Sequence, residues 1–468
     1  MLFNSVEFLV FFVATTVLFF LFPHRFRWFL LLFASCVFYM FFKPVYILIL
    51  AFTIAIDYYA GLKIESAIDP RVRKHYLVLS LIANIGILAV FKYYNFLNDN
   101  ITGLAGLMGF KNHIPYLNIL LPLGLSFHTF QAMSYTIEVY RGNHKAERHF
   151  GIYALYVMFY PQLVAGPIER PQNILYQFHE KKYFDYDRVL AGLRMMLLGF
   201  FKKIVIADRL GVYVDNVYGD VQHANSVSML IALFFFAFQI YCDFSGYSDI
   251  AIGAAKVMGY DLMKNFDRPF MSRSVTEFWR RWHISLSSWF NDYLFTPIVV
   301  AKRDWGKWAV LFSLLITFLL SGLWHGAGWP FLIYGFVHGA AVSYEFLTKK
   351  TRVRLSKKIP GLLYNPISQL LTFSFVCLAL VFFRAGTFSK TKLVFKTLFS
   401  FHFSFNLTQL CAEKGPLNLL LSFLVIFSFY FINKLYKSRL TFAFSIIAFF
   451  SIIILSKDVS RTFIYFQF

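Results

Sequence analysis

Two of the twelve histidines in this sequence lie among tryptophans within apolar stretches, where an imidazole could take part in chemistry. His325 stands in Gly-Leu-Trp-His-Gly-Ala-Gly-Trp-Pro, residues 322–330. The glycines permit a close approach of the backbone, and Pro330 is expected to interrupt a continuous helix. An imidazole can act as a base near neutral pH. The segment therefore predicts a general base, with a buried histidine bonded to a carbonyl as the alternative.

The second histidine, His283, lies in a segment with the pattern of an amphipathic helix, residues 274–290. Ser274 and Glu277 have the spacing of a capping box, which predicts that the helix begins there. A helix of this kind suits a membrane interface. A histidine that only packs and one that takes part in chemistry therefore both remain open. The face of the predicted helix carries Trp279, Trp282, His283, Leu286 and Phe290.

Charged side chains near these histidines supply candidate partners. Arg273, Arg280 and Arg281 could bind a phosphate group of a substrate, although membrane topology alone also explains them. Asp243 and Asp249 could orient a histidine or pair with an arginine. Carboxylates within apolar runs usually face a protein interior or a cavity. We therefore expect the functional site in the central part of the chain.

Other sequence signals are weaker. His338 could support the site or pack between helices, and packing is the preferred interpretation for His128. The sequence has no Gly-x-Ser-x-Gly elbow, no Walker loop and no zincin motif. The four cysteines form no C-x-x-C pair and no metal-binding spacing, so no metal site is predicted. Direct group transfer assisted by histidine is the simplest chemistry that remains.

The elements that position these residues must be membrane helices, because the composition excludes a soluble protein. Hydrophobic residues make up 58% of the chain and charged residues 15%, against about 45–50% and about 25% in soluble domains. The net charge of +21 comes from basic residues in short loops between apolar runs. Such a distribution indicates membrane topology and contact with lipid headgroups rather than nucleic acid.

Roughly a dozen apolar runs approach the length of about 20 residues that a membrane-crossing helix needs. Some are expected to be re-entrant, because proline and polar residues interrupt them. The runs are 6–22, 26–42, 45–62, 76–93, 114–140, 150–164, 189–206, 227–241, 308–320, 331–346, 367–383, 417–435 and 440–455.

The basic residues also predict an orientation in the membrane. The segment before the first run has no lysine or arginine, and the second loop has only Lys43. The third loop, residues 63–75, has four basic residues, and the first and fifth loops are also rich in them. Cytoplasmic loops carry the excess of positive charge. The N-terminus is therefore predicted to lie outside, and the 63–75 loop in the cytoplasm.

Residues 279–289 and 322–329 resemble the two histidine motifs of the membrane-bound O-acyltransferase (MBOAT) family, most closely the bacterial alginate O-acetyltransferase type. Further similar runs are residues 121–131, 161–168, 243–253 and 463–468. The sequence departs from the pattern at 295–300, which reads Phe-Thr-Pro-Ile-Val-Val. It departs again at His128, where tyrosine or phenylalanine is more usual.

The resemblance implies an all-α polytopic membrane protein with about eleven or more helices around a central tunnel, including broken or re-entrant helices. It implies one membrane-embedded domain over 1–468, with N-terminal helices in 1–150, a catalytic core in 151–346 and C-terminal helices in 347–468. His325 would be catalytic, and His283 would support the transfer. The pocket or its support would include Trp279, Arg280, Arg281, Trp282, Trp324, Asp243 and Asp249.

The same resemblance implies an activity and its participants. Acetyl would move from a cytoplasmic thioester, acetyl-CoA or another acyl thioester, with no bound cofactor. The acceptor would be the hydroxyls of an exported, alginate-like polysaccharide or a periplasmic acetyltransferase partner. The protein would be a multi-pass protein of the bacterial inner membrane, in contact with lipid and not with nucleic acid. Peptidoglycan O-acetylation, D-alanyl transfer, a proton-coupled transporter and a non-catalytic platform for polymer export remain alternatives.

Overall fold

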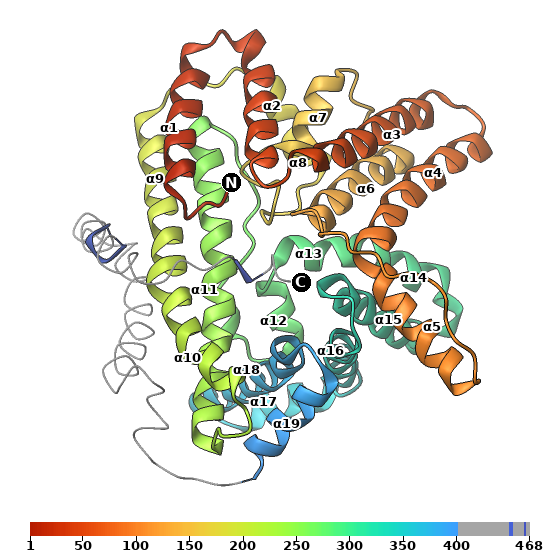
Figure 1. The fold of residues 1–468 in the computed structure, drawn as a ribbon, viewed down its shortest axis with the longest axis vertical. Coiled ribbons are helices and arrows are strands. Elements are labelled where there is room, and N and C mark those ends of the chain that lie inside the picture. Colours follow the sequence, from red (N-terminus) through yellow and green to blue (C-terminus); the bar gives the residue numbers. More distant parts are fainter. Residues whose placement is uncertain (401–448, 453–462, 465–468) are drawn as a thin grey trace. The chain divides into compact units, whose positions relative to one another are not determined.

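The computed structural model describes residues 1–400, 449–452 and 463–464, and these residues form helices and no β-strand (Figure 1). This confirms the all-α prediction for the described part of the chain. Within that part, five helical segments are long and apolar enough to cross a membrane. They are Pro44–Ser66, Pro70–Leu107, Ser226–Met258, Lys307–His325 and Gly361–Ala385. The composition-based prediction of a polytopic membrane protein is therefore confirmed.

The chain forms two compact units, and the first comprises Met1–Met196 and Tyr247–Met263. Its helices are α1 (Val6–Leu21), α2 (His24–Met40), α3 (Ile47–Ser66), α4 (Pro70–Leu88), α5 (Tyr94–Leu107), α6 (Leu125–Arg141), α7 (Phe150–Met158), α8 (Pro171–His179) and most of α9 (Tyr186–Phe200). A 3₁₀ turn, Pro44–Tyr46, precedes α3, and a π turn, Ala89–Tyr93, joins α4 to α5.

A buried polar cluster joins three helices of the first unit. Asp57 on α3 accepts hydrogen bonds from Ser80 Oγ at 2.6 Å and from Asn84 Nδ2 at 2.9 Å, both on α4. Ser80 Oγ also lies 3.0 Å from Thr136 Oγ1 on α6. A polar group buried among apolar helices is tolerated only when its hydrogen bonds are made. The cluster therefore fixes the register of α3, α4 and α6.

The second unit comprises Leu197–Gly246 and Lys264–Phe468. Its helices are α10 (Asp208–Gly219), α12 (Val275–Arg281), α13 (Ile284–Phe290), α14 (Thr296–Ala301), α15 (Lys307–His325), α16 (Trp329–Leu347), α17 (Lys349–Lys358), α18 (Gly361–Ala385) and α19 (Phe388–Leu398). The long helix α11 (Ser226–Met258) contributes to both units. Shorter turns are Phe201–Ala207, Pro269–Met271, Asn291–Phe295 and Arg303–Trp305.

Helices α15 and α16 form a closely packed antiparallel hairpin in the second unit. The two helices approach so closely that a Cβ on Gly322 would lie 2.2 Å from the carbonyl oxygen of Phe331. Only glycine fits at such a distance. The helices are separated by residues 326–328, and Pro330 occupies the first turn of α16. The prediction that helix continuity fails before Pro330 is confirmed.

Most predicted apolar runs correspond to helices, with three differences. Helix α11 has 33 residues, because it continues through the polar segment 239–249 beyond the predicted run 227–241. The run 114–140 becomes helical only at Leu125, after Gly124 with φ of 73°. The run 150–164 stays helical only as far as Met158. Run 417–435 lies outside the described residues, as does 440–455 except for 449–452, which are helical.

Candidate active site

The two predicted histidines lie side by side in the second unit. His325 is the last residue of α15, and His283 lies between α12 and α13. Both side chains are buried, and their ring centroids are 6.5 Å apart. Trp324 lies near both, at 5.8 Å from His283 and 5.0 Å from His325. Segments separated by about forty residues in the chain thus form one buried histidine site.

The segment that carries His283 is not one continuous helix, so the prediction of a single helix over 274–290 was wrong. Helix α12 ends at Arg281 and α13 begins at Ile284. His283 between them has a left-handed backbone, with φ of 45° and ψ of 53°. Such a conformation is unfavourable for a residue with a side chain and persists only where its surroundings enforce it. The apolar face continues across the break, which is why the periodicity suggested one helix.

Asn265 enforces the break at His283. The backbone carbonyl oxygen of Asn265 accepts a hydrogen bond from Ile284 N at 2.9 Å. Its side-chain Oδ1 accepts from Ser285 N at 3.2 Å and from Ser285 Oγ at 3.0 Å. His283 Nδ1 lies 3.3 Å from the same Oδ1. An amide oxygen only accepts, so Nδ1 carries the proton and Nε2 is the atom of His283 that can accept one. Asn265 was missed at the sequence level, because it lies in an irregular loop without any motif.

The electrostatic surroundings keep His283 neutral. Burial holds the pKa of His283 well below its ordinary value, and the nearby His325 contributes in the same direction. A neutral imidazole with its proton fixed at one nitrogen is suited to accept a hydrogen bond or a proton at the other.

Aromatic rings surround His325. Besides Trp324, the ring of Phe383 lies 5.5 Å away and that of Tyr334 lies 6.2 Å away. A Cβ on Gly326 would lie 2.2 Å from the ring of Phe331, so the turn after His325 is filled by that ring. An apolar setting of this kind excludes water and strengthens the electrostatic interactions inside it.

The start of α12 was predicted correctly, although only half of the capping box forms. Ser274 Oγ accepts from Glu277 N at 3.0 Å. The Glu277 carboxylate accepts from Arg273 N at 2.8 Å instead of returning to Ser274. It also pairs with Arg281 at 2.8 Å. Arg281 therefore stabilises α12 rather than facing a substrate, whereas Arg280 is exposed on a cavity wall.

The remaining predicted tryptophans are buried within the second unit. Trp279 Nε1 donates to His338 Nδ1 at 3.2 Å. Trp282 packs against Phe278 and Phe266, with ring centroids 5.4 and 5.1 Å away. Of the three predicted tryptophans, Trp324 lies beside both His283 and His325, whereas Trp279 contacts His338 and Trp282 packs among phenylalanines.

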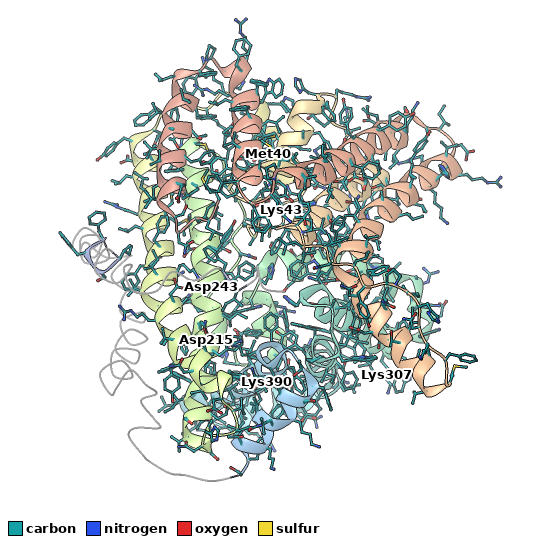
Figure 2. The ribbon with its side chains drawn as sticks, in the orientation of Figure 1. Met40, Lys43, Asp215, Asp243, Lys307 and Lys390 are labelled. Carbon is teal, nitrogen blue, oxygen red and sulfur yellow. The ribbon has the colours of Figure 1, made fainter. Side chains whose placement is uncertain are left out.

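Asp243 partners a lysine rather than a histidine or an arginine. Lys203 Nζ donates to Asp243 Oδ1 and to Asp208 Oδ1, each at 2.7 Å, and all three side chains are buried. The other oxygen of Asp243 accepts from Ile464 N at 2.8 Å. Figure 2 shows Asp243 on α11. Asp249 lies in the part of α11 that belongs to the first unit, where it is half-buried.

A cavity of about 1270 Å³ adjoins the histidine site. Its walls are largely apolar and include Trp279 and Phe318. Arg280 and Lys349 add positive charge, and Arg352 is paired with Glu345 at 3.0 Å. Its described lining does not include His283, His325 or His338. Among the described residues, no three His, Cys, Asp or Glu side chains come together to hold a metal ion. The arrangement can bind an elongated anionic molecule beside a buried base.

The chain is similar to several known proteins. A family model described as membrane-bound O-acyltransferase matches residues 148–385. The probable alginate O-acetylase AlgI of Pseudomonas aeruginosa is 36% identical over 403 residues, covering 86% of this chain and 75% of that protein. The peptidoglycan O-acetyltransferase of Helicobacter pylori is 34% identical over 78% of this chain and 72% of that protein. The teichoic acid D-alanyltransferase of Bacillus subtilis is 29% identical over 59% and 72%. Both histidines and the whole described cavity lining fall within the matched residues.

Proposed function

This chain belongs to the membrane-bound O-acyltransferase family, and on that basis we propose that it transfers acetyl from a cytoplasmic thioester to hydroxyls of an exported polysaccharide. Family membership makes the chain an acyltransferase. The acetyl group and the polymer acceptor follow from relatives named as alginate and peptidoglycan O-acetyltransferases. The relative named as a D-alanyltransferase is less similar and covers a smaller share of this chain, which favours acetyl transfer.

The observation that carries this proposal is a pair of buried histidines beside a cavity with basic residues in its wall. His325 takes the proton from the attacking hydroxyl as its oxygen forms a bond with the thioester carbonyl carbon. The carbon–sulfur bond then breaks, and the proton passes to the leaving thiolate. His283, held by Asn265, supports this transfer from its Nε2 side. The products are an acetyl ester and a free thiol, so no covalent enzyme intermediate is needed.

The cavity supports an acyl thioester that carries phosphate groups, such as acetyl-CoA. Its volume exceeds the range of about 300–1,000 Å³ of ordinary small-molecule pockets. Arg280 and Lys349 provide charges that can bind phosphate, whereas Arg352 pairs with Glu345 in the same wall at 3.0 Å. The apolar part of the wall suits the uncharged end of such a donor. Basic groups concentrate on the cytoplasmic side of membrane proteins, which is where acyl thioesters are made.

The proposed activity also implies a location for the protein and a partner. A donor used inside and a polymer modified outside require a protein that spans the bacterial inner membrane and contacts its lipids. A periplasmic acetyltransferase is the proposed partner where the polymer does not itself receive the acetyl group from this chain.

Replacement of His325 tests the proposal. His325→Ala should reduce ester-bound acetate on the exported polymer by about 10²–10⁴-fold, the usual contribution of a general base. Protein in the membrane fraction should remain close to the wild-type amount. His128→Ala is the control, because it removes another buried histidine from the first unit. Wild-type acetate per unit of His325→Ala protein would refute the proposal, and would also be the result expected of an export platform.

A further inference from the structure

Two aromatic residues, Trp279 and Phe318, form a wall between the cavity and the buried His338. Trp279 and Phe318 both line the cavity, and their ring centroids are 5.3 Å apart. On its other side, the Trp279 ring lies 5.2 Å from His338, which is fully buried and does not belong to the described lining. A donor that enters the cavity therefore meets the indole of Trp279 before it meets His338, and Tyr334 beside His338 lies 6.2 Å from His325.

His338 holds this indole by a hydrogen bond. The direction of that bond determines which ring nitrogen of His338 carries the proton. An indole N–H can only donate, so His338 Nδ1, 3.2 Å from Trp279 Nε1, is unprotonated and the ring proton is on Nε2. His338 Nε2 is buried and makes no hydrogen bond to the residues that the structure describes. Leaving a buried N–H without a partner is unfavourable. A phenylalanine would fill the same space without that loss, so packing alone does not account for a histidine here.

The helix that carries His338 is a rigid support for this hydrogen bond. A Cβ on Gly335 of α16 would lie 2.2 Å from the carbonyl oxygen of Phe318 on α15, so the two helices cannot approach further. One turn before His338 on the same helix, the ring of Tyr334 lies 4.6 Å from His338 and 6.2 Å from His325. His338 is therefore fixed relative to the proposed catalytic base.

The helix that carries Trp279 is by contrast short, and α16 holds it at a second point. Helix α12 has seven residues. Glu345 on α16 accepts from Val275 N at 2.8 Å and from Thr276 N at 2.9 Å, at the first turn of α12. Glu345 thus fixes the beginning of α12, and His338 fixes the indole of Trp279 one turn later.

We propose that His338 is a positioning residue that holds Trp279 as a movable wall between the donor cavity and His325. The hydrogen bond between Trp279 and His338 keeps the route closed, and its opening admits the thioester end of the donor to the histidines. The proposal rests on the proposed function only in taking His325 as the reacting group.

Thiol labelling of the full-length protein in detergent tests this without any acyl transfer. Cys36, Cys242, Cys377 and Cys411 are replaced by serine, and His325→Cys places a reporter behind the wall. The probe is a water-soluble methanethiosulfonate. His338→Phe should raise the labelling rate of the reporter about 10-fold, because the hydrogen bond to Trp279 is lost. Trp279→Phe should raise it similarly, and the double variant should label no faster than either single variant.

Two further variants separate positioning from general packing. His338→Asn places an amide oxygen near the position of Nδ1, so it should accept from Trp279 and keep the slow rate. Ser321→Cys is the control reporter, because Ser321 lines the cavity in front of the wall and should label equally with and without His338.

Three results would overturn the proposal. The reporter at 325 could label at the same rate in the His338→Phe background, the asparagine variant could behave like the phenylalanine variant, or the Ser321→Cys control could accelerate as well. Failure of the proposed function is recognised separately, as an active His325→Ala protein.

Discussion

At the scale of single residues, His283 depends on Asn265 for its unusual backbone. Four contacts from one asparagine meet His283, Ile284 and Ser285, at distances between 2.9 and 3.3 Å. A residue other than glycine in the left-handed region costs about 1–3 kcal/mol. These hydrogen bonds offset that cost, and they orient the imidazole ring beside His325.

Asn265→Ala should therefore disturb catalysis through His283. We expect polymer-bound acetate per unit of membrane protein to fall by about 10–100-fold, the scale of loss that follows misplacement of a reacting group. Ser285→Ala is the matched control, since it removes only the hydroxyl that shares the same Asn265 oxygen. Polymer-bound acetate in the Ser285→Ala variant should fall by no more than about 3-fold. Equal activity in the two variants would contradict the positioning role of Asn265.

The neutral state of His283 predicts a dependence of stability on pH. Burial lowers the pKa of His283 in the folded protein, whereas the same histidine in the unfolded chain has the ordinary pKa of about 6.5. Below that pH the unfolded chain therefore binds more protons at this residue than the folded protein does. The free energy of unfolding therefore falls as the pH falls below that value. The loss from this group should develop between pH 7 and pH 5, as the histidine of the unfolded chain takes up its proton.

Thermal unfolding of the purified protein at the two pH values measures this loss. His283→Gln should show a smaller decrease in midpoint temperature than the wild type on going to pH 5. If both proteins lose the same amount, His283 does not contribute to the pH dependence.

Sequence alone predicted the histidine pair but not the residues that hold it. His283 and His325 stand in motifs rich in tryptophan and glycine, and their types already suggested a base. Asn265 and Lys203 carry no such signal, because their roles arise only from contacts made in the fold. The partner of Asp243 could not be deduced for the same reason.

At the scale of elements, apolar periodicity indicates which face is buried but not whether a helix is continuous. The face from Trp279 to Phe290 keeps its spacing across the break at His283, so one helix was expected where two short helices form. The break between α15 and α16 was predictable, because glycines and Pro330 mark it in the sequence. The length of α11 was underestimated, because its polar residues face a protein interior and not a loop.

The close hairpin of α15 and α16 predicts different outcomes for two glycines. Gly322→Ala would place a methyl group 2.2 Å from a backbone oxygen that cannot easily move. We expect a destabilisation of about 1–3 kcal/mol, as for other overpacked sites. Gly328→Ala is the control, because its nearest neighbours would lie at 3.7 Å, an ordinary contact. Thermal unfolding in detergent compares the two, and a Gly322→Ala protein as stable as Gly328→Ala would count against the close packing.

At the scale of the whole molecule, composition was sufficient to predict a helical membrane protein. The abundance of apolar residues and the scarcity of charge leave few other folds. Composition was not sufficient to decide which apolar runs cross the membrane, because length and hydropathy do not distinguish spanning helices from re-entrant ones. The division into segments 1–150, 151–346 and 347–468 of one domain stays a prediction.

The distribution of positive charge predicts the sidedness of the donor site. Helix α17, Lys349–Lys358, has six basic residues and no acidic one, and Lys349 and Arg352 line the cavity. The 63–75 loop is also basic. Since cytoplasmic segments carry this excess, both should face the cytoplasm, the compartment in which acyl thioesters are made.

Cysteine labelling in spheroplasts measures that orientation directly. In a background without the native cysteines, Ile68→Cys and Thr351→Cys provide exposed reporters in the 63–75 loop and in α17. A membrane-impermeant maleimide should label neither of them until the membrane is permeabilised. Lys111→Cys, in the next loop, should label at once, because alternation places that loop outside. Rapid labelling of Ile68→Cys in sealed spheroplasts would reverse the predicted orientation. Rapid labelling of Thr351→Cys alone would place the basic end of the cavity on the side away from the donor, and the proposed direction of acetyl transfer would then be wrong.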